Sequence, residues 1–150
     1  MPTLRLEPLN AANIVAANAL TLKPGQQAYA TPVSYSTAEH TVNPSAAWPR
    51  VVLDGDEVVG FIKGNLDPDE RREEFRCCLW SINVKASAQG RGVGRFAVQA
   101  LADEARSRGF ERLTAIWERG EGGPEEFFLR LGFTPVGETQ YGEVLGATHL

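Results

Sequence analysis

Hydrophobic and polar residues follow one another along this chain with two periods, and each period predicts one kind of element. Alternation and short β-branched runs predict strands, because successive side chains of a strand point to opposite faces. The predicted strands are residues 3–7, 50–53, 58–66, 73–84, 112–117, 133–136 and 141–148. Asp54-Gly55 joins two of them, and this dipeptide is typical of a tight hairpin turn. The pattern therefore predicts a sheet with several antiparallel neighbours.

Apolar residues spaced by three and four predict helices between these strands. The predicted helices are residues 10–22, 36–42, 93–108 and 124–131. Asn10 is a suitable N-cap for the first of them, and Gly109 ends the third. The third helix connects two strands as a crossover, so those strands should run parallel. We expect an α/β (α+β) fold with about four helices and a mixed, mostly antiparallel sheet.

Composition narrows the classes of protein that fit. A chain of 150 residues is expected to form one domain, residues 1–150. Its net charge of −4 does not suggest nucleic-acid binding. No apolar run approaches the roughly 20 residues of a membrane span, and no export signal is visible, so we expect a cytoplasmic protein. Cys77 and Cys78, with only His40 and His149, give no metal-ligand spacing.

A glycine-rich turn between a predicted strand and the longest helix is the main candidate for chemistry. It reads Gln89-Gly90-Arg91-Gly92-Val93-Gly94-Arg95. The first N–H groups of a helix lack intrahelical acceptors and can bind an anion, which the two arginines would also attract. Two explanations stay open: a cradle for a diphosphate, or a tight turn that only needs flexible glycine.

This run, after a strand, resembles the acetyl-CoA pyrophosphate loop of the GNAT superfamily of N-acetyltransferases, whose pattern is Gln/Arg-x-x-Gly-x-Gly/Ala. Residues 127–133, Phe-Phe-Leu-Arg-Leu-Gly-Phe, resemble the helix-then-strand segment that those enzymes carry downstream. The two motifs have the order and spacing of the family. The resemblance implies a GNAT fold, in which two central parallel strands splay apart at their C-terminal ends, and acetyl-CoA as cofactor.

In that family the pantetheine arm enters the splayed strands and the diphosphate reaches the glycine loop. By position, the resemblance implies cofactor binding by Ile82, Asn83, Val84, Gln89, Gly90, Arg91, Gly92, Val93, Gly94, Arg95 and Phe128. Phe128 is a departure, because the family usually has a tyrosine there that protonates the leaving thiolate. Tyr35, Tyr141 or solvent could replace that acid.

The implied reaction is direct attack of an amine on a thioester in a ternary complex. A carboxylate, directly or through water, could take the amine proton, and a backbone N–H near Asn83 or Val84 could bind the carbonyl oxygen. The candidate catalytic residues are Glu118 and Ser81. Glu118 is either the base or a solvated loop carboxylate. Ser81 and Asn83, predicted to share one face of the strand, could hold a water or satisfy a bulge; Trp80 and Ile82 are expected on the other face.

Several further stretches are similar to bacterial spermine/spermidine (diamine) acetyltransferases. They are residues 22–29, 34–36, 54–56, 59–61 and 142–144. This resemblance implies a small-molecule amine as substrate, with a polyamine as the first candidate. In the GNAT family exposed closing strands often pair between subunits, so a homodimer is compatible with the sequence, which does not give the oligomeric state. Carboxylates would steer such a cation: Glu39, Glu118, Glu121 and Glu143. The expected substrate-binding residues are Gln26, Tyr29, Tyr35, Glu39 and Glu121.

Other functions stay open. Pro24 and Gly25 stand where the polyamine enzymes carry acidic residues. The loop at 26–37 either borders a site or is a plain surface connection. The alternatives are acetylation of another small amine, an aminoglycoside or a protein amine, or a weakly active or non-catalytic acyl-CoA-binding domain, which Phe128 would suit.

Overall fold

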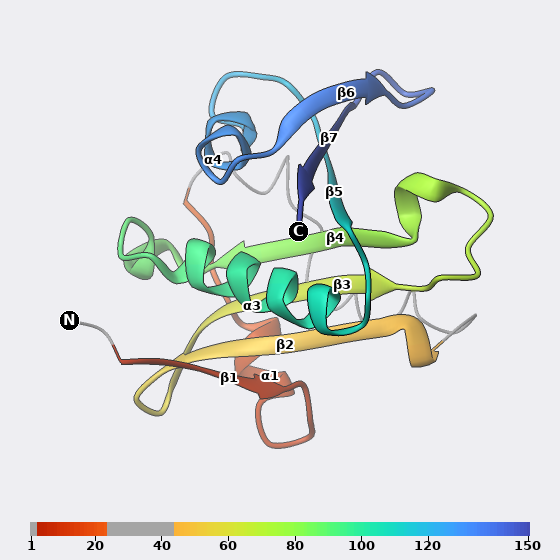
Figure 1. The fold of residues 1–150 in the computed structure, drawn as a ribbon. Coiled ribbons are helices and arrows are strands. Elements are labelled where there is room, and N and C mark those ends of the chain that lie inside the picture. Colours follow the sequence, from red (N-terminus) through yellow and green to blue (C-terminus); the bar gives the residue numbers. More distant parts are fainter. Residues whose placement is uncertain (1–2, 24–43) are drawn as a thin grey trace.

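Seven strands form one sheet in the computed structural model, which describes residues 3–23 and 44–150. Hydrogen-bonded neighbours follow the order β1-β2-β3-β4-β5-β7-β6 (Figure 1). The strands are β1 Leu4–Pro8, β2 Ala47–Asp54, β3 Glu57–Leu66, β4 Cys77–Val84, β5 Arg112–Trp117, β6 Thr134–Glu138 and β7 Val144–His149. β4 and β5 run parallel, and the other neighbours run antiparallel. The predicted α/β class with a mixed sheet is confirmed.

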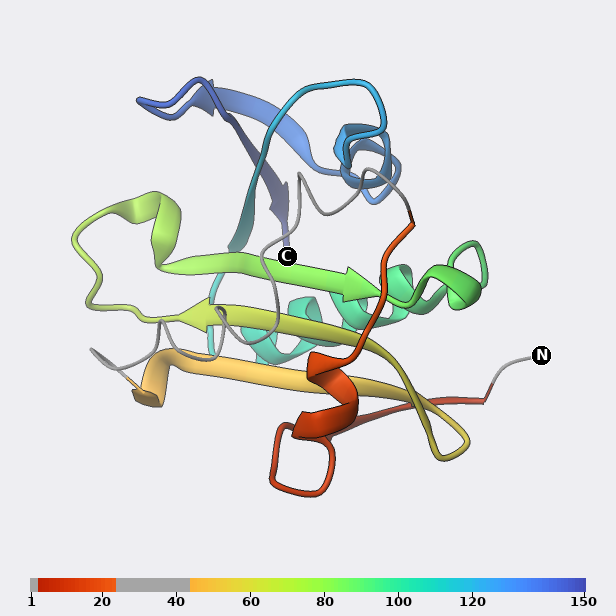
Figure 2. The ribbon, with the colours of Figure 1, turned by 180° about the vertical axis from the view of Figure 1, so that it is seen from behind.

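Helices lie on both faces of this sheet. The α-helices of the described residues are α1 Ile14–Asn18, α3 Val93–Ser107 and α4 Glu125–Arg130. α3 packs across β3 and β4 on one face, and α1 packs on β3 from the other (Figures 1 and 2). Short 3₁₀ turns at Pro44–Ala46, Glu73–Phe75 and Ala86–Ala88 precede β2, β4 and α3. Within residues 3–23 and 44–150, no helix is both long enough and apolar enough to cross a membrane.

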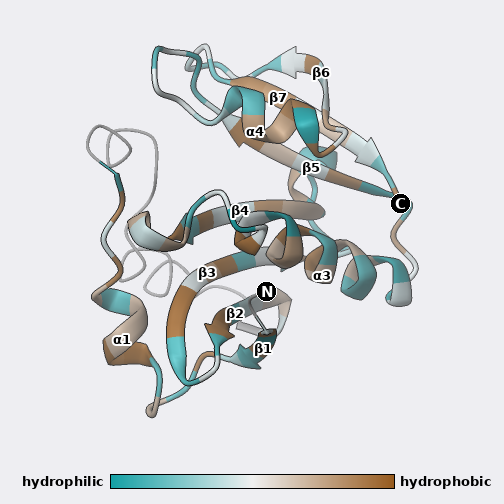
Figure 3. Cartoon of the chain, turned by 90° about the vertical axis from the view of Figure 1, so that its left-hand side faces the viewer, coloured by the Kyte–Doolittle hydropathy of each residue, from teal (hydrophilic) through white to brown (hydrophobic). Residues whose placement is uncertain are grey.

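Two apolar clusters hold the layers together. The larger lies between the sheet and α3, where Ile62 of β3 and Leu101 of α3 are fully buried. The smaller lies under α1 and includes Phe61 and Ala17. Both faces of β3 are covered, and its residues from Val58 to Ile62 accordingly form a continuous apolar run instead of alternating. Figure 3 shows this hydrophobic colouring along the central strands.

Most predicted elements are confirmed, but several are shorter than expected, among them the strand predicted at 141–148, which begins only at Val144. The helix predicted at 10–22 is reduced to α1, because Asn10 Oδ1 accepts hydrogen bonds from the N–H groups of Ala12 (2.8 Å) and Asn13 (3.2 Å) and forms a turn ahead of the helix. The strand predicted at 73–84 begins at Cys77, because Glu73–Phe75 is a 3₁₀ turn. The helix predicted at 36–42 lies outside the described residues.

β4 and β5 separate soon after they begin to pair. Among the described residues, Cys78 pairs with Thr114 and Leu79 with Ala115, and the ladder between the two strands stops there. β4 continues to Val84 and stays paired with β3 on its other side. The edge of β4 from Trp80 to Val84 therefore faces a wedge between two parallel strands, as the sequence resemblance implied.

A β-bulge lies in β4 where the wedge opens. Ser81 pairs with Lys63 and Leu79 with Gly64, so Trp80 is an extra residue without a counterpart on β3. Such an insertion bends the strand and redirects the side chains around it. The bulge interrupts the regular alternation on which the expectation of a shared face for Trp80 and Ile82 was based. Strict alternation resumes beyond the bulge, where Ser81 and Asn83 lie on the face opposite α3, as predicted for those two residues.

Candidate active site

The glycine-rich turn bends sharply into α3 and leaves the start of that helix open. Gly90 and Gly92 have φ angles of +80° and +85°, which side chains with a Cβ rarely adopt. Gly92 is the N-cap of α3, and no side chain caps the helix there. A Cβ at either glycine would meet no described atom within 4 Å. The N–H groups of the first turn, beginning at Val93, are therefore accessible to a ligand.

At Gly94 a side chain is excluded by packing and not by the backbone conformation. Its φ is not positive, but a Cβ there would lie 2.7 Å and 2.9 Å from Cε1 and Cζ of Phe127. The ring of Phe127, on α4, thus lies directly against the first turn of α3. From the sequence, the glycines could serve either phosphate access or a tight turn that needs flexible glycine. In the structure, Gly90 and Gly92 serve the backbone geometry of the turn, and Gly94 allows close packing between helices.

The side chain of Gln89 connects the glycine-rich turn to the end of β4, which borders the wedge. Its Nε2 donates a 3.0 Å hydrogen bond to the carbonyl oxygen of Val84, the last residue of β4. The backbone N–H of Lys85 donates to Val59 O (2.8 Å), and that of Ala86 donates to Thr21 O (2.7 Å). The connection from β4 to α3 is thereby fixed to β3 and to the segment after α1. This arrangement holds the open end of α3 at a set distance from the strand edge.

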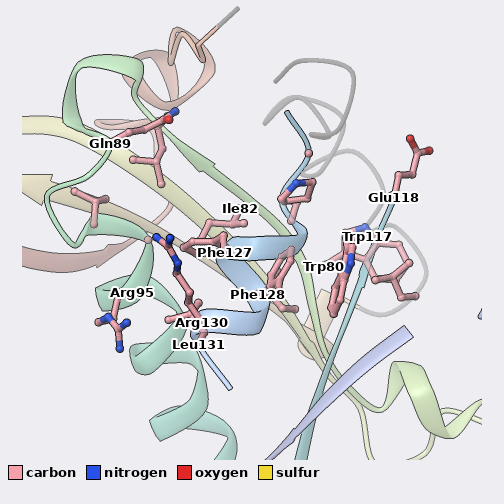
Figure 4. Close-up of a pocket in the computed structure, with 18 of the residues that line it drawn as sticks. Trp80, Ile82, Gln89, Arg95, Trp117, Glu118, Phe127, Phe128, Arg130 and Leu131 are labelled. Atoms are coloured by element: carbon pink, nitrogen blue, oxygen red, sulfur yellow. The ribbon is translucent and has the colours of Figure 1, made fainter. Parts of the chain in front are cut away.

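A cavity of about 850 Å³ runs from this turn into the wedge between β4 and β5 (Figure 4). It brings together most of the predicted site residues. Those that line it are Ser81, Ile82, Val84, Gln89, Gly90, Gly92, Val93, Gly94, Arg95, Glu118 and Phe128. Asn83, Arg91 and Glu121 do not line it, although Glu121 neighbours Gly122, which does. Gln26, Tyr29, Tyr35 and Glu39 lie outside the described residues.

The sequence reasoning missed an aromatic part of the lining. Trp80, Trp117, Phe127 and Phe75 line the cavity, together with Leu22, Arg130 and Leu131. Trp117 could have been found, because it ends the predicted strand that borders the wedge. Trp80 gave no signal, since the residue types of a bulge match those of a regular strand.

Phe128 lies in an aromatic cluster instead of projecting into open space. Its ring stacks on Trp117 with centroids 5.0 Å apart and meets Phe127 and Phe133 edge to face at 5.3 Å and 5.6 Å. Only 4% of the residue is exposed. Phe128 therefore packs α4 onto β5 and contributes one apolar surface to the cavity. It offers no proton donor.

Glu125 fixes the other side of this cluster. Its Oε2 accepts hydrogen bonds from Trp117 Nε1 (2.8 Å) and Arg119 Nε (3.1 Å). These donors, the indole first, lower the pKa of the carboxyl group below its ordinary value, so it is ionised at neutral pH. The first turn of α4 is thereby held to the end of β5, and the loop between them, residues 118–124, closes one end of the cavity.

The two ends of the cavity carry opposite charges. The cations among the described lining residues are Arg95 and Arg130, from α3 and α4, and the carboxylates are Glu118 and Glu143. Figure 4 shows Arg95 and Arg130 on one side and Glu118 on the other. Glu118 directly follows Trp117, and Glu143 directly precedes Val144, the residue of β7 that pairs with Trp117. An anion is favoured near α3 and a cation near the end of β5.

Ser81 and Asn83 are buried on the face of β4 opposite α3. Asn83 is 5% exposed, and its Oδ1 accepts no hydrogen bond from the described residues. A buried amide oxygen in this state can bind a water or a ligand group. Ser81 lines the cavity and Asn83 does not, so Ser81 is the better placed of the two to hold a water near a substrate.

Neither cysteine is suited to nucleophilic attack. Burial is the main cause that raises the pKa of Cys77 to about 12 and that of Cys78 to about 11. Cys78 lines the cavity, but both groups are neutral thiols near pH 7, and the thiolate is the reactive form. A covalent relay through either sulfur is therefore disfavoured, whereas direct transfer between two bound molecules needs no such nucleophile.

Comparison with known proteins agrees with this architecture. The model of the acetyltransferase (GNAT) family matches residues 18–133, which include the wedge, the glycine turn, α3 and α4. The chain belongs to the acetyltransferase (GNAT) family. The resemblance found from the two sequence motifs is thereby confirmed at the level of the family.

The individual relatives of this GNAT chain match it either over a short segment or at low sequence identity. A segment of 53 residues is 42% identical to the L-2,4-diaminobutyric acid acetyltransferase of Shouchella clausii (strain KSM-K16); it spans 35% of this chain and 28% of that protein. The GNAT domain of S. lividans PAT superposes with a TM-score of 0.75 at 16% identity, covering 98% of this chain and 90% of that one. The ribosomal-protein-S18-alanine N-acetyltransferase of Escherichia coli superposes with a TM-score of 0.72 at 18% identity, covering 98% and 94%. These solved structures share the fold.

Proposed function

We propose that this chain transfers an acetyl group from acetyl-CoA to a primary amine by direct attack in a ternary complex. The observation that carries the proposal is one continuous cavity, which connects the open start of α3 with the unpaired edge of β4 and with Glu118. A diphosphate fits the first of these places, an amide-bearing chain the second, and an amine the third. The family match supports the same reaction class.

The residues present fit each part of coenzyme A. The N–H groups at the start of α3, with Arg95 beside them, suit two linked phosphates, because the helix dipole and the guanidinium both favour negative charge there. Residues 80–84 of β4, which have no partner on β5, can hydrogen-bond the amides of the pantetheine arm as an added strand would. The hydrogen bond from Gln89 to Val84 O fixes the start of α3 relative to the edge of β4.

Acetyl-CoA, when bound, supplies the acetyl group as a thioester that an amine can attack directly. The chain then has to position the amine, accept its proton and bind the carbonyl oxygen. We assign the proton to Glu118, or to a water held by Ser81, because both line the cavity. A backbone N–H near Asn83 or Val84 is proposed to donate to the carbonyl oxygen.

A polyamine is the first candidate acceptor, and a diamino acid is the second. The polyamine follows from the sequence resemblance and from Glu118 and Glu143 at the mouth of the cavity. The diamino acid follows from the partial relative, whose name is that of a diaminobutyric acid acetyltransferase. Both acceptors carry a primary amine and a second positive charge.

A thiol-release assay with acetyl-CoA tests the proposal. Spermidine, 2,4-diaminobutyrate, simple monoamines and an aminoglycoside are offered in turn, and the acetylated product is identified by mass spectrometry. We expect release with at least one amine. Acetyl-CoA binding without release from any amine would favour the second candidate, a non-catalytic acyl-CoA-binding domain, for which Phe128 in place of a proton donor is the supporting observation.

A further inference from the structure

Trp80 is the one tryptophan of the chain that is open to solvent. All three tryptophans lie in the described residues, and Trp48 and Trp117 are each 3% exposed whereas Trp80 is 40% exposed. Trp80 is also the extra residue of the bulge in β4. Its exposed surface contributes to the cavity described above.

The ring of Trp80 is braced by side chains of the turn that precedes β4. Phe75, in the turn before β4, meets Trp80 edge to face with centroids 5.9 Å apart and planes at 61°. The guanidinium of Arg72 in turn lies 4.4 Å from the centroid of Phe75. Contacts of this kind restrict the rotamers of an otherwise exposed ring. The indole ring of Trp80 is therefore held in one orientation and presents a fixed surface to the cavity.

The place of Trp80 in the cavity indicates what that surface contacts. In the view of Figure 4, Trp80 lies on the same side of the cavity as Trp117 and Glu118, and Arg95 and Arg130 lie on the other side. A second lining carboxylate, Glu143, directly precedes the β7 residue that pairs with Trp117. An indole face beside carboxylates attracts ammonium groups, and tryptophan is the strongest of the aromatic side chains in this role.

We propose that Trp80 is the residue that selects the acceptor, by holding an ammonium group other than the one that is acetylated. The acceptor then belongs to the diamines or diamino acids, and its second charge lies against the indole with Glu118 and Glu143 close by. This inference rests on the proposed function. It adds a specificity-determining residue to the cavity and excludes simple monoamines as preferred substrates.

The test compares 1,4-diaminobutane with 1-aminobutane, which differ only in the second amine. The wild type should acetylate the diamine with a kcat/KM about tenfold higher, from the usual strength of a cation–π contact. Trp80→Leu should remove that preference by lowering kcat/KM for the diamine about tenfold more than for the monoamine, and Trp80→Phe should keep part of the preference. Calorimetry measures the acetyl-CoA affinity of all three proteins, so that a change in cofactor binding is separated from a change in acceptor selection.

A second readout does not depend on turnover. Acrylamide should quench the fluorescence of Trp80 and spare the two buried tryptophans, and the diamine should protect it more than the monoamine does. Equal rates and equal protection with both amines would overturn the inference and leave the acetyltransferase proposal standing. No turnover with any amine would overturn both.

Discussion

At the scale of single residues, glycines in the same short turn serve separate purposes. Gly92 takes a left-handed backbone conformation in open space, whereas Gly94 has ordinary angles and lies against the ring of Phe127. A substitution at Gly92 therefore strains the backbone, and one at Gly94 pushes α4 away from α3. The two changes should be separable by experiment, although both lie within the same anion-binding motif.

Gly94→Ala is expected to lower the free energy of unfolding by about 1–3 kcal/mol, the usual cost of overpacking. The new Cβ would approach Phe127 to within 2.7 Å, so the aromatic ring or the helix has to move. Chemical denaturation of both proteins measures the difference. Gly137→Ala, in the exposed strand β6 with no atom within 4 Å of the new Cβ, is the matched control and should change stability little. Equal losses at both positions would contradict the packing account.

Phe128→Tyr is expected to raise turnover. Phe128 lines the cavity at the position where the family usually carries a tyrosine, and the added hydroxyl could protonate the departing thiolate. Steady-state kinetics under saturating acetyl-CoA measures kcat, and calorimetry checks that acetyl-CoA affinity is kept. An unchanged kcat would mean that protonation of the thiolate does not limit the rate.

At the scale of elements, close packing of α3 on β3 sets the position of the whole site. A Cβ at Gly64 would lie 2.4 Å from Leu101 Cδ1, so the absence of a side chain on β3 lets α3 sit directly on the sheet. The N-terminus of the same helix forms the proposed diphosphate site. The geometry of that site therefore depends on a contact far along the helix.

Gly64→Ala and Leu101→Ala should each destabilise the fold, the first by about 1–3 kcal/mol through overpacking and the second by about 2–5 kcal/mol through a cavity. The double variant should lose less than the sum, because the new methyl group occupies part of the space that the leucine leaves. Urea titrations of the wild type, the two single variants and the double variant give the free energies of unfolding for this double-mutant cycle. Strict additivity would show that the two residues do not share this space.

The periodic elements of the sheet could be predicted from the sequence, and the local irregularities that shape the site could not. β5 has the predicted bounds, because an apolar run between charged residues can be read locally. The bulge at Trp80 depends on the register with Lys63 and Gly64, which are distant in sequence. α1 is shorter than predicted because Asn10 uses its side chain in a turn. Long-range packing decided these features.

At the scale of the whole molecule, opposite charges at the two ends of one cavity would orient the two proposed substrates toward each other. Arg95 and the start of α3 favour the anionic partner, and Glu118 and Glu143 favour the cationic one. The splayed strands join these ends, since β4 and β5 stop pairing between them. The sequence motifs identified the end of the cavity that favours an anion. The aromatic surface at the end that favours a cation became visible only in the folded structure.

The pH dependence of global stability should reflect the two buried thiols of β4. In the unfolded chain they ionise near the ordinary value of 9.0, but burial raises the pKa of Cys78 to about 11 and that of Cys77 to about 12. Above pH 9 the unfolded state therefore binds fewer protons than the folded state, and stability falls as pH rises. Below pH 9 this contribution is fully present.

Thermal or urea unfolding between pH 8 and 11 measures this slope. A variant carrying Cys77→Ala and Cys78→Ala should lose less stability over the same interval than the wild type does, even if it begins from a lower value at neutral pH. Parallel slopes for the two proteins would assign the alkaline loss to other groups.

The central claim is that the start of α3 binds the diphosphate of coenzyme A. Calorimetric titration of acetyl-CoA into the wild type and into a Gly92→Val, Gly94→Val variant tests it most directly, with circular dichroism to verify that the variant is folded. We predict saturable binding of one molecule to the wild type and loss of that binding in the folded variant. No uptake by the wild type, or equal affinity in both proteins, would contradict the account.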